Sequence, residues 1–114
     1  MLTTLISLNL KYVRIEWIKQ EDDTVIAVEK SEANEDSLII DLGNIDRDKL
    51  IDEVVGVLGK ELKIPKPILG NIKARLRKLK FPITINLIEH ELSNELLFKS
   101  TSESFKVIIR YQVL

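Results

Sequence analysis

The chain has 114 residues, of which 45% are hydrophobic and 31% are charged, and it contains no cysteine. These values are typical of one soluble globular domain, so we expect a single domain over residues 1–114. The lack of cysteine excludes disulfides, thiolate zinc sites and thiol catalysis.

No stretch reaches the ~18 continuous apolar residues of a membrane span, and residues 1–10 lack the features of a signal peptide. We therefore expect no membrane partner and a cytoplasmic location. The abundance of Ile, Leu, Lys and Glu is typical of proteins from hot habitats and favours a thermophilic source.

The net charge of −1 conceals two segments of opposite sign. Residues 16–53 contain thirteen acidic and four basic residues, which gives −9. Residues 60–80 contain eight basic residues and one acidic residue, which gives +7. The charge distribution is therefore dipolar along the chain.

The first part of the chain predicts three strands. Residues 5–18 have strand-like alternation, but the apolar face changes between Tyr12 and Val13, which predicts a bulge or bend in one long strand. Alternatively, the two ends of this strand are buried on different faces, one of them under a partner subunit. Residues 24–30, rich in β-branched side chains, form a hairpin with it, and residues 38–42 form a third, short strand after a polar loop.

Two amphipathic helices are predicted in the middle of the chain. Asp46 is a suitable N-cap for the first helix, which ends before Pro65. Pro67 suits the first turn of the second helix, and the Phe81-Pro82 pair ends it. The short connection between the helices indicates that they are neighbours.

Three further strands are predicted at residues 83–87, at residues 96–99 and from residue 105 to the last residue, 114. Strands grouped before and after a helical pair predict an α+β fold, with a mostly antiparallel sheet of five or six strands and both helices packed on one face. The order of elements resembles that of PAS and profilin-type domains, and this likeness of topology implies no activity.

The second helix carries a row of cations beside its apolar stripe. Lys66, Lys73, Arg77 and Lys80 lie on one flank of the helical wheel. Such a row can follow the phosphates of a nucleic acid, which makes polyanion binding at these residues a candidate function. Two alternatives are a solvated helix face and neutralisation by the acidic segment of the same chain or of a second copy.

Gly56 and Gly59 form a Gly-x-x-Gly pattern like the loop with which KH domains clamp a nucleic-acid backbone. The intervening Val57 and Leu58, however, fit the apolar arc of a continuous helix. Because each glycine costs ~1 kcal/mol relative to alanine inside a helix, we interpret the pair as a place where another segment approaches closely.

No set of residues predicts catalysis or a cofactor. His90 is the only histidine, and one histidine without cysteine cannot form an ordinary zinc site. The acidic clusters lack the spacing of a calcium loop, and no phosphate loop, nucleophile elbow or dinucleotide fingerprint is present. We therefore expect no catalytic residue, no metal, no cofactor and no enzymatic activity.

Three apolar residues are candidates for an interface. Ile88 and Ile108 are expected on the sheet face opposite the helices, and the phase change places Trp17 there too. Alternatively, Trp17 covers one end of the core. The sequence thus favours a small, non-catalytic intracellular interaction module, a homodimer or a subunit of a larger assembly. Nucleic-acid binding by the second helix is the alternative.

Overall fold

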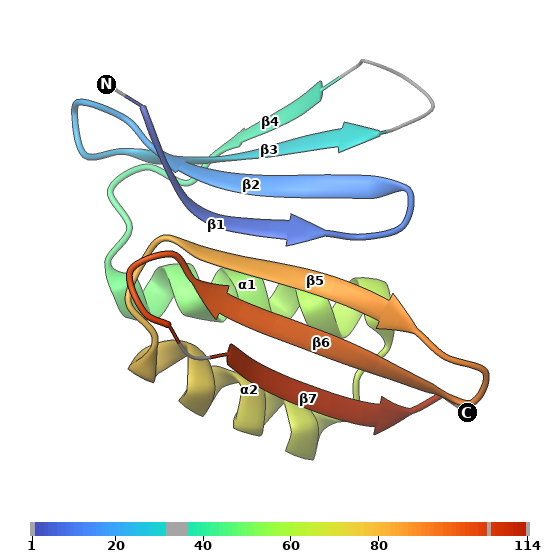
Figure 1. Ribbon diagram of the computed structural model, residues 1–114. Helices are drawn as coiled ribbons and strands as arrows, with labels where there is room; N and C mark the ends of the chain where they lie inside the picture. Colours follow the sequence, from blue (N-terminus) through green and yellow to red (C-terminus); the bar gives the residue numbers. More distant parts are fainter. Residues whose placement is uncertain (1, 32–36, 105, 114) are drawn as a thin grey trace.

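The computed structural model describes residues 2–31, 37–104 and 106–113, and shows seven strands and two helices (Figure 1). Most of the predicted loop after the second predicted strand lies outside the described residues. The elements are β1 (Thr3–Asn9), β2 (Val13–Lys19), β3 (Val25–Ser31), β4 (Ser37–Asp41), α1 (Arg47–Leu62), α2 (Lys66–Lys78), β5 (Ile83–Glu89), β6 (Ser93–Ser100) and β7 (Lys106–Gln112).

The strands form one sheet in the order β4-β3-β2-β1-β5-β6-β7. Neighbouring strands are antiparallel except for β1 and β5, which run parallel at the centre of the sheet. This parallel pair is possible because the two helices provide the long crossover between β4 and β5. The predicted α+β class, mostly antiparallel sheet and two helices on one face are confirmed, with seven strands instead of five or six.

The prediction of one bent strand over residues 5–18 was wrong. The segment is a hairpin of β1 and β2, closed by a turn in which the Leu10 amide donates to the Val13 carbonyl at 2.9 Å. Because the chain reverses there, Ile6 lies opposite Trp17 and Leu8 lies opposite Ile15. The change of apolar phase therefore marks a turn, after which both strands present their apolar side chains to the same face.

The helix boundaries follow the signals in the sequence. The Asp46 carboxylate accepts a hydrogen bond from the Lys49 amide at 2.8 Å, as expected of an N-cap. Lys63 ends α1 in the left-handed conformation, with φ of 52°. Pro67 lies in the first turn of α2, where its missing amide hydrogen is not needed.

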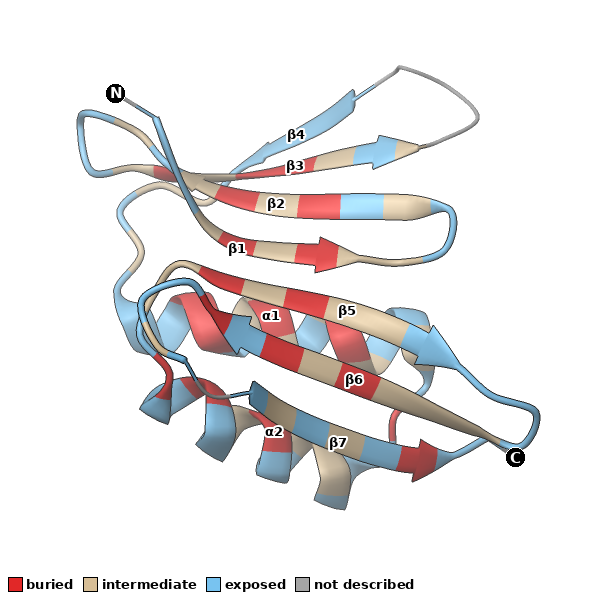
Figure 2. Ribbon diagram, viewed as in Figure 1, coloured by how far each residue is buried: buried red, intermediate tan, exposed pale blue. Residues whose placement is uncertain are grey.

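The core lies between the helices and one face of the sheet, and Figure 2 shows buried residues on both layers. Leu50, Val54 and Leu58 of α1 are fully or almost fully buried, as are Ile72 and Leu76 of α2. Their partners on the sheet are mostly large apolar side chains, including Ile6, Leu8, Trp17, Ile83, Ile85, Leu96 and Phe98.

The helices cover only part of this face. Seven strands spaced at ~4.8 Å span about 29 Å, whereas two helices, each about 10 Å wide, cover about 20 Å. No helix lies over β3 and β4 in the described part of the chain (Figure 1). The uncovered width corresponds to one helix and lies at the β4 end of the sheet.

Candidate functional site

The edge strand β4 exposes apolar side chains on both of its faces. Leu38, Ile39 and Ile40 are 56%, 62% and 45% exposed. Leu38 and Ile40 pair with Glu29 and Ala27, on the helix side of the sheet, whereas Ile39 projects from the opposite face. A solvated edge strand needs no large apolar side chain on either face, so β4 has the composition of a strand that is covered on both sides.

The opposite edge of the sheet has a different character. On β7, Lys106 and Arg110 are exposed on the helix-free face, and Arg110 pairs with Glu95 on the neighbouring strand. Charged side chains on an edge strand oppose pairing with another chain. β4 lacks lysine and proline and carries one acid, Asp41, at its end. The β7 edge is therefore protected by charge against pairing with another chain, whereas the β4 edge lacks this protection.

A groove of about 360 Å³ lies between α1 and strands β2–β4. Its floor includes the buried Trp17, and no residue of the described chain accepts a hydrogen bond from the buried Trp17 Nε1. Charged residues border the groove and include three acids and one lysine. The groove is lined by Ile15, Trp17, Ala27, Glu29, Leu38, Ile40, Glu53, Gly56, Val57, Lys60 and Glu61.

The two glycines of α1 have different surroundings. A Cβ atom at Gly59 would lie 2.9 Å from Cδ1 of Leu69, so this glycine allows α1 and α2 to pack closely. Gly56 lines the groove, and a Cβ atom there would meet no atom of the described residues within 4 Å. Close approach is thus confirmed for Gly59 alone. The pair lies inside a continuous helix with Leu58 fully buried, which rules out a KH-type loop at this position.

The predicted interface residues do not lie on one face. Trp17 is fully buried on the helix side, so its predicted place on the helix-free face was wrong; the turn between β1 and β2 is the reason. Ile88 and Ile108 are 40% and 59% exposed, and their neighbour Leu97 is partly buried. An interface at these residues stays a prediction.

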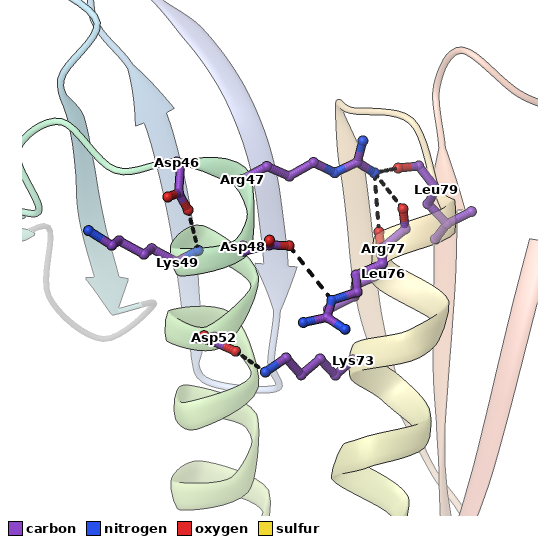
Figure 3. A network of polar contacts seen from close by, with 9 residues as sticks. All are labelled: Asp46, Arg47, Asp48, Lys49, Asp52, Lys73, Leu76, Arg77 and Leu79. Atoms are coloured by element: carbon purple, nitrogen blue, oxygen red, sulfur yellow. Dashed lines mark hydrogen bonds and ion pairs between the residues drawn. The ribbon is translucent and has the colours of Figure 1, made fainter.

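Two of the four predicted polyanion-binding cations pair with acids of α1 (Figure 3). Lys73 Nζ lies 2.5 Å from Asp52 Oδ1, and Arg77 Nε lies 3.7 Å from Asp48 Oδ1. Lys66 and Lys80 are exposed and make no ion pair with another described residue. The acidic and basic segments therefore meet between the two helices of one chain.

Arg47 is a structural residue that the sequence analysis did not identify. Its Nη2 donates to the carbonyls of Leu76 and Arg77 at 3.4 and 3.0 Å, and also to the Leu79 carbonyl (Figure 3). Its guanidinium also lies 4.8 Å from the centroid of the Phe81 ring. A cation at the C-terminal end of α2 satisfies free carbonyls and interacts favourably with the helix dipole.

His90 belongs to a small ionic cluster on β5–β7. Glu95 lies 3.4 Å from His90 Nε2 and accepts a hydrogen bond from Arg110 Nε at 2.8 Å. The bond from Arg110 lowers the pKa of Glu95 below its ordinary value of 4.5, so this carboxylate stays ionised and is a poor proton donor at neutral pH. Among the described residues, no group of His, Cys, Asp and Glu is placed to hold a metal ion.

Comparison with known protein families, curated proteins and solved structures finds no match to this chain. Neither described helix is long and apolar enough to cross a membrane. The candidate site is therefore defined by its geometry: an unprotected apolar edge at β4 and, beside it, a groove bordered by acidic residues.

Proposed function

We propose that this protein is a non-catalytic interaction module that self-associates through the edge strand β4. The observation that carries the proposal is the exposure of Leu38, Ile39 and Ile40 on a strand with an open edge. Pairing two such strands satisfies the free backbone groups of both and covers apolar surface at the same time.

The sequence of β4 is well suited to pairing with itself in antiparallel orientation. With a two-fold axis through Ile39, this residue faces its own copy, and Leu38 of one chain faces Ile40 of the other. In the same register, Ser37 faces Asp41, which places a hydroxyl donor opposite a carboxylate. Such an interface is self-complementary, as a closed dimer requires.

The test compares lysine variants of exposed isoleucines by light scattering. Ile39→Lys introduces a charge at the centre of the proposed pair and is expected to convert a dimer into a monomer. Ile108→Lys makes the same change on the other edge strand and is expected to leave the dimer intact. Because Ile39 and Ile108 are 62% and 59% exposed, both variants should fold equally well.

Two results would overturn the proposal. A wild-type chain that stays monomeric at high concentration has no β4 dimer. A dimer that dissociates in Ile88→Lys or Ile108→Lys, but not in Ile39→Lys, uses the helix-free face of β5–β7 instead.

Nucleic-acid binding by α2 is the alternative proposal. Its support is the group of exposed cations that form no ion pair with a described residue, which includes Lys66, Arg75, Lys78 and Lys80. A gel shift at low salt that is lost on charge reversal of Lys66 and Lys80 would support this alternative. No shift with single- or double-stranded DNA or RNA would eliminate it.

A further inference from the structure

We infer that the groove between α1 and strands β2–β4 is a docking site for an amphipathic helix of another protein, with lysine or arginine on both sides of its apolar stripe. This inference goes beyond self-association, because the groove lies between β4 and α1 on the helix side of the sheet, whereas the proposed dimer forms along the open edge of β4. Leu38 and Ile40 line the groove and also flank the proposed dimer contact at Ile39.

The width of the uncovered sheet identifies the kind of occupant. The two helices leave about 10 Å of the sheet face uncovered, which is the diameter of one α-helix. A helix placed over β3 and β4 would lie beside α1 and complete the layer. It would cover Leu38 and Ile40, whose side chains project to this face and are about half exposed.

The wall of the groove on α1 favours a helix as well. Gly56 is exposed, has open space in front of it and costs ~1 kcal/mol relative to alanine. Unlike Gly59, it has no neighbour among the described residues that explains its small size. A glycine at this place lets a second helix axis approach α1 closely, as small residues do at helix crossings. The contact runs from Glu53 to Glu61, about 12 Å or just over two helical turns.

The border of the groove defines the charge of the occupant. Glu29, Glu53 and Glu61 border it, with Lys60 as the one opposing charge. Complementarity with this net negative border requires cations beside the apolar stripe of the docking helix. An apolar stripe between basic flanks is also the pattern by which many amphipathic helices bind hydrophobic grooves.

The test uses a synthetic peptide of about 14 residues, built from leucine and lysine with leucines at helical spacing. Trp17 is the only tryptophan of the chain and lies at the floor of the groove, so its fluorescence reports on occupation. We expect saturable binding with one peptide per chain, seen by fluorescence and calorimetry. The same peptide with glutamate in place of lysine should not bind.

Two arginine variants of exposed helical glycines locate the site. Gly56→Arg fills the groove with a cation and should weaken binding at least about tenfold. Gly70→Arg makes the same change on α2, where a Cβ atom also meets no atom within 4 Å, and should leave binding unchanged. Both variants gain helix propensity, so a loss of binding in Gly56→Arg alone cannot come from unfolding. The charge reversal Glu53→Lys should also weaken binding of the peptide, whereas the same reversal at Glu91, in the β5–β6 turn, should not.

Measuring these affinities in the Ile39→Lys background separates the two proposals. If the wild type is a dimer and the monomeric Ile39→Lys variant still binds the peptide, both the β4 dimer and the helix-docking groove are supported. If the wild type is itself a monomer and binds the peptide, only the helix-docking groove is supported. The inference is overturned if binding of the leucine-lysine peptide does not saturate or if the glutamate peptide binds equally well. It is also overturned if Gly56→Arg and Gly70→Arg bind the leucine-lysine peptide with the same affinity. It is also overturned if Gly56→Arg dissociates an oligomer, because the groove then holds a second copy.

Discussion

Gly59 of α1 lies directly against Leu69 of α2, and a Cβ atom at this glycine would come within 2.9 Å of the leucine Cδ1. Three residues earlier, Gly56 faces open space. One glycine therefore serves the packing of the two helices inside the chain, whereas the other leaves room that no described residue fills.

This difference predicts unequal effects of two identical substitutions. Gly56→Ala should raise the free energy of unfolding by about 1 kcal/mol, because alanine is the better helix former and its methyl group has space. Gly59→Ala should gain clearly less, or lose stability, because Leu69 must move to admit the methyl group. Urea unfolding of both variants measures the difference. Equal gains would show that Leu69 adapts without cost.

Arg47 predicts a second measurable effect on stability. Removing its side chain by Arg47→Ala leaves carbonyls at the end of α2 without their cationic donor and should cost about 1–3 kcal/mol. Arg47→Lys should restore only part of the loss, because an ammonium group lacks the planar guanidinium fork and its stacking on Phe81. Lys49→Ala, an exposed change two residues away, is the control for loss of a positive charge in the first turn.

Thermal unfolding compares these variants under identical conditions. A loss in Arg47→Ala no greater than in Lys49→Ala would contradict a role for Arg47 at the end of α2. Full recovery in Arg47→Lys would show that charge alone accounts for the contact.

The sequence was sufficient for most of the elements but not for how they are joined or covered. Asp46, Pro65 and Pro67 are local signals, so the helix boundaries could be predicted well. The turn between β1 and β2 contains Leu10, Lys11 and Tyr12, without the glycine or proline that marks most turns. Its position therefore appeared only as a change of apolar phase.

The candidate site depended on tertiary arrangement. The sequence Leu38-Ile39-Ile40 predicts a strand, but only the order of strands in the sheet places it at an edge with no helix above it. The role of Arg47 was equally hidden, because its partners are carbonyls about thirty residues away. A cation in the first turn of a helix is unfavourable for that helix, and this is the one local sign of an external partner.

The cluster of Glu95 with Arg110 and His90 predicts a dependence of stability on pH. Because the folded state lowers the pKa of Glu95, the stability from this group is present above about 4.5 and is lost as the pH falls below that value through the folded pKa. As the pH is lowered, the free energy of unfolding of Glu95→Gln should therefore fall less than that of the wild type. Denaturant unfolding across this range in wild type and Glu95→Gln measures the change. Parallel curves for the two proteins would show that Glu95 ionises alike in both states.

The ion pairs between the helices predict how the chain behaves toward polyanions. Asp52 and Asp48 lie beside Lys73 and Arg77, so replacing both acids with asparagine frees two cations on the flank of α2. Asp48→Asn combined with Asp52→Asn should elute from a heparin column at higher salt than the wild type. Its free energy of unfolding should change by no more than about 1 kcal/mol per pair, since these pairs are exposed to solvent.

A control variant with the same net charge decides whether position matters. Asp22→Asn combined with Glu91→Gln also removes two negative charges, but from turns outside the two helices. If the two double variants shift the elution equally, net charge alone governs retention, and the flank of α2 has no special role. A larger shift for the Asp48 and Asp52 variant would show that the acidic segment of α1 shields the basic flank. In that case, the polarised charge of the sequence acts within one chain, and binding of a polyanion by α2 requires these pairs to break.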